Sequence, residues 1–142
     1  MSLKEETLQL LGDPLAEGGL RFCAANDAYG QLTLRYSGKA VDLEIEIART
    51  DNFIYVLACR KGAFNSPGYT DIDGSPIRVH YQQALRTLGK DPSLLIAIIR
   101  LMNGTSGPFY ENALSAISMS IKENWAEIEA RQETVFSSPQ KK

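Results

Sequence analysis

Residues 31–60 decide the fold and read QLTLRYSGKAVDLEIEIARTDNFIYVLACR. Within 31–36 and 40–48, apolar side chains alternate with polar ones, which is typical of strands that bury one face. Residues 53–60 are apolar on both faces, as in a strand that is covered on two sides. Short turn-forming stretches separate the three segments. The pattern therefore predicts three consecutive antiparallel strands.

The phase of the alternation predicts how the first two strands pair. A two-residue loop at Ser37 and Gly38 would pair Leu34 with Val41, and it would place the apolar residues of both strands on one side. A three-residue loop would set the two patterns out of phase. We therefore expect the shorter loop.

Helical spacing marks both ends of the chain. In 3–11, apolar residues recur at near-helical intervals until a Gly-Asp-Pro stretch at 12–14, so we expect a short first helix. In 109–131, apolar residues recur every three or four positions, which predicts a long amphipathic helix. Those residues are Leu114, Ile117, Ile121, Trp125 and Ile128. Residues 133–142 are mostly polar, and we expect a frayed tail.

The segments between these elements are less regular. Residues 61–75 are rich in turn-forming residues and are expected to form a long connection. Residues 76–88 combine strand-like alternation with a helix start, so we expect a mixed segment in which helix is slightly favoured. The apolar run 93–102 favours a buried strand over a helix. Together these elements predict one compact α+β domain over 1–132, with a twisted, mainly antiparallel sheet of about five strands, a short N-terminal helix and a long C-terminal helix.

Composition limits the partners that the chain can have. Its 142 residues carry a net charge of −2, so it offers no general surface for nucleic acid or anionic lipid. No apolar run approaches the length of a membrane span, and the longest covers only Leu94 to Ile99. The first six residues lack the apolar region of a secretory signal. We therefore expect a cytoplasmic protein that binds neither nucleic acid nor membrane.

Catalytic and metal-binding signatures are weak. Cys23 and Cys59 each lie in an apolar run, and we expect both to be buried thiols. His80 is the single histidine, and no nucleophile motif accompanies it. Asp71 and Asp73 precede Gly74, but their spacing does not fit a calcium loop. We therefore expect a protein that is not an enzyme and that uses no metal and no cofactor, with a small enzyme using Asp71, Asp73 and His80 as a minor alternative.

Two surface features remain for function. The second face of 53–59 presents Phe53, Tyr55 and Leu57, and it must be covered by a helix, a second subunit or a ligand chain. Beside it, one strand face carries three carboxylates, which we interpret as a solvated outer surface. They belong to Asp42, Glu44 and Glu46. A short helix beside an open apolar strand face suits an extended peptide.

The order of elements, with Leu88-Gly89-Lys90-Asp91-Pro92 ahead of the apolar run 94–101 and a long final helix containing Trp125, resembles the Tir-chaperone family, the class I chaperones of type III secretion. The similarity in pattern runs from about Leu8 to Ile128. Two features differ from the family pattern: the middle helix is poorly encoded between Lys61 and Gln83, and an additional strand is indicated near 20–24.

The resemblance implies a non-enzymatic, cytosolic homodimer that holds the chaperone-binding segment of a secreted effector in an extended form. The effector would hydrogen-bond to a sheet edge and insert apolar side chains into surface hollows. Burial patterns single out five candidate contact residues: Leu8, Leu11, Phe53, Tyr55 and Leu57.

The main alternative is another binding module, such as an immunity protein or an orphan regulatory domain. In that case the acidic face of Asp42, Glu44 and Glu46 would meet a basic protein partner. Binding steered by charge would weaken as salt rises, whereas binding in an apolar groove would not.

Overall fold

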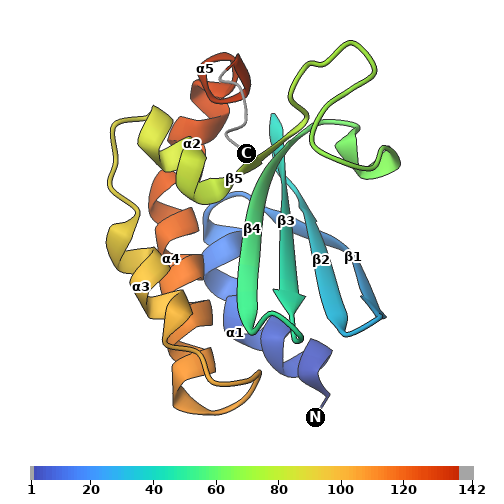
Figure 1. Ribbon diagram of the computed structural model, residues 1–142. Helices are drawn as coiled ribbons and strands as arrows, with labels where there is room; N and C mark the ends of the chain where they lie inside the picture. The colour runs from blue at the N-terminus through green and yellow to red at the C-terminus, as the bar shows by residue number, and fades with distance from the viewer. Residues whose placement is uncertain (1, 138–142) are drawn as a thin grey trace.

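A computed structural model describes residues 2–137 and contains one five-stranded antiparallel sheet with helices packed on one face (Figure 1). The strands lie in chain order: β1 (Arg21–Ala28), β2 (Gln31–Ser37), β3 (Val41–Ala48), β4 (Phe53–Arg60) and β5 (Arg78–His80). The helices are α1 (Leu3–Glu17), α2 (Tyr81–Thr87), α3 (Ser93–Arg100), α4 (Gly107–Ala130) and α5 (Gln132–Ser137). The predicted α+β class is confirmed.

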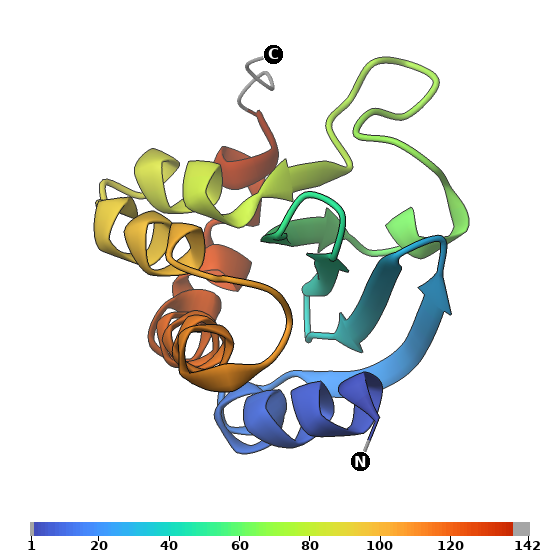
Figure 2. The ribbon, with the colours of Figure 1, turned by 60° about the horizontal axis from the view of Figure 1, so that its bottom comes forward.

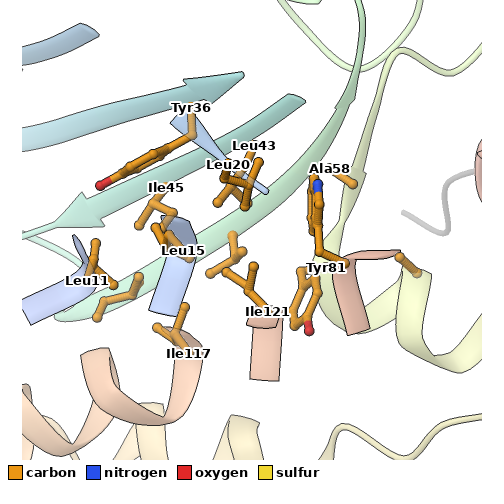
Figure 3. Close-up of a cluster of buried hydrophobic side chains, with 14 of the residues drawn as sticks. Leu11, Leu15, Leu20, Tyr36, Leu43, Ile45, Ala58, Tyr81, Ile117 and Ile121 are labelled. Carbon is orange, nitrogen blue, oxygen red and sulfur yellow. The ribbon is translucent and has the colours of Figure 1, made fainter. Parts of the chain in front are cut away.

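The hydrophobic core lies between the inner face of the sheet and the helices (Figure 3). Leu11 and Leu15 of α1 and Ile117 and Ile121 of α4 meet Ile45 of β3 and its neighbours there. All five side chains are almost completely buried, as the alternation in 40–48 predicted for Ile45 and the spacing in 109–131 for Ile117 and Ile121. Leu11 was predicted to contact a partner, and that prediction is wrong because α1 packs it into the core. Burying such aliphatic side chains stabilises the fold by about 1.5 to 3 kcal/mol each.

The pairing of β2 with β3 differs from the expected register. Leu34 pairs with Ile45, four residues beyond the predicted partner Val41. An even shift keeps the apolar side chains on the same face, so the core is unchanged. The turn is longer because the carboxylate of Glu129 in α4 accepts hydrogen bonds from the backbone N–H groups of Ala40 (2.6 Å) and Val41 (3.1 Å).

The N-terminal helix α1 is longer than expected. It continues through Pro14 to Glu17, although a proline inside a helix removes one backbone hydrogen bond. Burial of Leu15 in the core offsets that cost. A buried hydrogen bond of 2.6 Å between the hydroxyls of Thr7 and Tyr110 also fastens α1 to α4.

The prediction of a strand over 93–102 is wrong, because Ser93–Arg100 forms helix α3. Its Ile99 and the following Met102 are buried in the shared core. A short apolar run fits either structure, and here helix packing decides. The mixed interpretation of 76–88 is confirmed, since β5 leads directly into α2.

The expectation of a frayed tail is wrong for 133–137. Helix α5 covers these positions, and its Val135 and Phe136 are fully buried. The guanidinium of Arg60 lies 4.7 Å from the ring centroid of Phe136, in cation–π geometry. Residues 138–142, the remainder of the predicted tail, lie outside the described residues.

Candidate functional site

The outer face of the sheet carries the side chains that the sequence predicted to point away from the core. In the β3–β4 ladder, Leu57 is opposite Glu44 and Tyr55 is opposite Glu46. The apolar strip of β4 therefore lies directly beside the carboxylates of β3. Helices α1 and α4 lie on the other side of the sheet (Figure 2), so α4 does not cover Tyr55.

The three carboxylates on this face do not form the solvated stripe that we expected. Asp42 is buried and forms an ion pair with Lys61 (2.6 Å). Glu44 is buried as well and pairs with both Arg35 (2.9 Å) and Arg78 (3.2 Å). Glu46 alone of the three has no ion pair within residues 2–137. The predicted acidic surface is therefore largely neutralised inside the chain.

The unpaired carboxyl of Glu46 is half-buried. Burial raises its pKa, and the negative charge of Glu44 adds to that effect, while Arg78 and Arg35 oppose it. The charged form of Glu46 is thus less favourable in the folded chain than in water.

Arg78 holds the connection 61–77 against the outer face of the sheet through hydrogen bonds. Its guanidinium donates hydrogen bonds to three backbone carbonyls, those of Ala63 (2.9 Å), Ser66 (2.7 Å) and Gly68 (2.7 Å). The side chain of Arg78 is only 7% exposed. A guanidinium can hold several carbonyls in this way because its donors form a rigid planar fork.

The connection 61–77 covers one end of the apolar strip. Ala63 and Ile77 pack with Leu57 and Cys59 in a second, smaller core, and Phe64 lies against it. At Leu57, the chain itself therefore covers the second apolar face of β4. Cys59 is a buried thiol, as predicted, and its burial raises the pKa of the thiol.

Where the connection 61–77 does not cover β4, four aromatic side chains follow one another on the outer face: Phe53, Tyr55, His80 and Tyr69. The rings of Phe53 and Tyr55 lie 5.0 Å apart, Tyr55 lies 6.3 Å from His80, and His80 lies 5.3 Å from Tyr69. Burial lowers the pKa of His80, which favours its neutral form. The arrangement is a packed side-chain cluster, and the buried Nδ1 of His80 has no hydrogen-bond partner within residues 2–137.

A hollow of about 430 Å³ opens between this face and the connection 61–77. Its lining mixes charged and apolar groups, and the cations Arg35 and Arg78 already contact Glu44. Three of the four charged groups that line this hollow are therefore committed to ion pairs within the chain, and Glu46 is the fourth.

A second hollow, of about 370 Å³, has a different character and lies between α1 and the edge of the sheet. It is mostly apolar and is lined by Leu8, Gly12, Ala16, Leu20, Arg21, Phe22 and Tyr36. β1 and the three-residue β5 are the two terminal strands of the sheet, so within residues 2–137 the outer edge of β1 has no neighbouring strand. Cys23, which we expected to be buried, is exposed on β1 beside an irregularity in the β1–β2 pairing. The prediction for this cysteine is wrong because its strand is an edge.

The wall of this second hollow contains an unusual hydroxyl. Tyr36 is 3% exposed, and its ring contacts that of Phe22 edge to face at 5.6 Å. Its hydroxyl is buried and has no hydrogen-bond partner within residues 2–137. Burial raises the pKa of Tyr36, so the hydroxyl stays protonated and can donate a hydrogen bond.

The predicted contact residues fall on two separate surfaces. Leu8 lines the hollow beside β1, and Leu11 is completely buried in the core. Phe53, Tyr55 and Leu57 belong to the opposite face of the sheet. The structure does not bring the two groups together.

The sequence analysis missed Gly12 and Ala16 as site residues. With Leu8 they are spaced by four positions along α1, so they share one helix face. Two small residues in that spacing leave the hollow open. This spacing was the signal in the sequence that could have identified them.

No group of three or more His, Cys, Asp or Glu residues within 2–137 is arranged to hold a metal ion. Among the helices of the same residues, none has the length and hydropathy that a membrane span requires. No protein-family model, no curated protein and no solved structure matches the chain.

Proposed function

We propose that this chain is a non-enzymatic protein that binds an extended segment of a partner polypeptide along the outer edge of β1. This is the role that the resemblance to the Tir-chaperone family implies. The single observation that carries the proposal is the position of a mostly apolar hollow directly beside an unpaired strand edge.

The two parts of the site would recognise a peptide in complementary ways. The free edge of β1 can exchange backbone hydrogen bonds with an added strand, which gives affinity for any extended chain. Alternate side chains of that strand point to the same face, and an apolar one would enter the hollow between Leu8 and Phe22. Tyr36 also lines that hollow, and its buried hydroxyl has no hydrogen-bond partner within residues 2–137.

The outer face supports this role less well than the edge does. Charge complementarity to a basic partner requires free carboxylates, but Asp42 and Glu44 are already paired with cations of the same chain. Phe53 and Tyr55 stay a predicted secondary contact area.

The test begins with peptides selected from a random display library against the full chain. We expect selected peptides to carry an apolar residue that is essential for binding. Replacing Gly12 by leucine should fill the hollow, because Gly12 lines it and a Cβ atom added there meets no atom within 4 Å. The G12L variant should lower peptide affinity by about tenfold or more, which corresponds to about 1.4 kcal/mol.

The matched control is Gln9→Leu, which adds the same side chain at an exposed position of α1 outside the lining. Q9L should bind peptide like the original chain. G12L should remain at least as stable to heat, since glycine is a poor helix former. Unchanged affinity of G12L for every selected peptide would contradict the proposal.

A further inference from the structure

The hollow of about 430 Å³ between the outer face of the sheet and the connection 61–77 has the size of a small-molecule pocket. Figure 2 shows this connection on the side of the sheet that faces away from α4. The hollow shares no lining residue with the apolar hollow beside β1, so it is separate from the proposed peptide site. Arg78 binds three carbonyls of the connection, and one wall of the pocket is therefore held in place by the fold.

One carboxylate in this hollow has no partner. Glu46 lines the hollow, is half-buried and forms no ion pair within residues 2–137. Its ionised form costs stability, because burial and the charge of Glu44 both disfavour it. A cationic group bound in the hollow would offset that cost.

A guanidinium with an unused donor group lies in the same hollow. Arg35 donates from Nε to Glu44 (2.9 Å) and from Nη1 to the carbonyl of Phe64 (3.5 Å), but its Nη2 has no hydrogen bond within residues 2–137. The side chain of Arg35 is 36% exposed, so an anionic group can reach it.

The unpaired carboxylate and this guanidinium are close enough to share one small ligand. Glu46 lies two positions beyond Glu44, the residue opposite Arg35 in the β2–β3 ladder. The Cβ atoms of such diagonal neighbours are at most about 7 to 8 Å apart. A molecule that carries a positive and a negative group a short distance apart can therefore contact both side chains.

The charges that line the hollow sum to zero. Two guanidinium groups and two carboxylates contribute: Arg35, Arg78, Glu44 and Glu46. A ligand with a single charge would leave a net charge in a partly desolvated site, which is unfavourable. A zwitterion adds an opposite partner for each available group and leaves the sum at zero.

We propose that this hollow binds a free α-amino acid with an apolar side chain, whose ammonium group pairs with Glu46 and whose carboxylate binds Arg35. The apolar side chain would lie against Leu57 and the rings of Phe64 and Tyr69, which line the same hollow. In an α-amino acid both charged groups are attached to one carbon atom, which suits the short separation of Glu46 and Arg35. In a dipeptide they are farther apart.

The first test is a titration of the full chain with L-leucine, L-methionine and L-phenylalanine, followed by the amide chemical shifts in NMR spectra. We expect saturable shifts in the connection 61–77 and in β2 and β3. Isoamylamine lacks the carboxylate of leucine, and isocaproate lacks its ammonium group. Each analogue, and the dipeptide leucyl-leucine, should bind at least about tenfold more weakly than leucine. The proposal is overturned if none of the three amino acids binds saturably, or if an analogue or the dipeptide binds as tightly as leucine.

Two variants test the assigned contacts. Glu46→Gln and Arg35→Met should each lower the affinity for the most tightly bound amino acid by about tenfold or more. The matched controls are Glu111→Gln and Arg100→Met, the same changes at exposed positions outside the lining, and they should bind like the original chain.

A loss of binding in E46Q cannot be explained by unfolding, because removing an unpaired, half-buried charge should make the chain more stable. The amino acid should accordingly raise the thermal midpoint of the original chain but not that of E46Q. Unchanged affinity in either E46Q or R35M would overturn the proposal.

Discussion

At the β4–β5 end of the sheet (Figure 1), the connection 61–77 covers the outer face at Leu57 and Cys59, whereas at the β1 end a long strand edge and the hollow beside it stay open. The closed end contains buried ion pairs and a guanidinium that binds three loop carbonyls. The open end contains a mostly apolar hollow and the buried hydroxyl of Tyr36, which has no hydrogen-bond partner among the described residues. The charged groups Glu44 and Arg78 of the closed end are therefore paired within the fold, although Glu46 and the buried Nδ1 of His80 there have no partner within residues 2–137, whereas the hollow and the strand edge of the open end are free to contact another chain.

The largest loss of stability is expected when the connection 61–77 loses its hydrogen bonds to Arg78. Arg78→Met should lower the free energy of unfolding by about 3 to 5 kcal/mol, because it leaves the buried carboxylate of Glu44 with one cationic partner and removes a hydrogen-bond donor from three carbonyls. Denaturant titration at neutral pH measures this loss, and amide exchange should increase in 61–77.

The matched control for that variant is Arg35→Met. Arg35 pairs with the same carboxylate, but its side chain is 36% exposed, so its loss should cost about 1 kcal/mol or less. Equal losses in the two variants would show that Arg78 does not fasten the connection.

A smaller change in stability, this time an increase, is expected when Glu46 is replaced. Its raised pKa means that the folded chain binds the proton more readily than the unfolded chain, so ionisation of Glu46 at neutral pH opposes folding. Glu46→Gln should therefore raise the thermal midpoint at pH 7. The difference should shrink as the pH falls through the raised pKa and vanish below the ordinary range of a glutamate. A variant that is less stable than the original chain at pH 7 would contradict this account.

The smallest change in stability is expected when Tyr36, at the β1 end of the sheet, is replaced in the protein without bound peptide. Tyr36→Phe removes a buried hydroxyl that has no partner within residues 2–137, so the free energy of unfolding should fall by less than about 0.5 kcal/mol or should rise. The same variant should weaken binding of selected peptides if the peptide supplies the missing partner. A loss of stability above about 1 kcal/mol would reveal a hydrogen bond that this account does not include.

Much of the sheet and the longest helix followed from periodicity alone. Strict alternation in 31–36 and 40–48 and helical spacing in 109–131 are local signals, and they were sufficient. The β2–β3 register was not predictable, because it depends on a contact between Ala40 and Glu129, 89 positions apart. Helix α3 was missed because an apolar run of this length carries no distinguishing period.

The candidate site was predictable only in part. Alternation placed Tyr55 on the face away from the core, and the structure agrees. It did not show that the connection 61–77 would fold back, since the partners of Arg78 are backbone carbonyls that leave no mark in the sequence. The sequence pattern also did not place Leu8 beside β1, because that position depends on how α1 packs against α4.

The most direct test of the central claim is amide hydrogen exchange of the full chain with and without a selected peptide. The account predicts new protection in Arg21–Ala28, the edge strand, with little change in Arg78–His80 at the other end of the sheet. Protection confined to Phe53–Arg60 and the connection 61–77, with β1 unchanged, would contradict it.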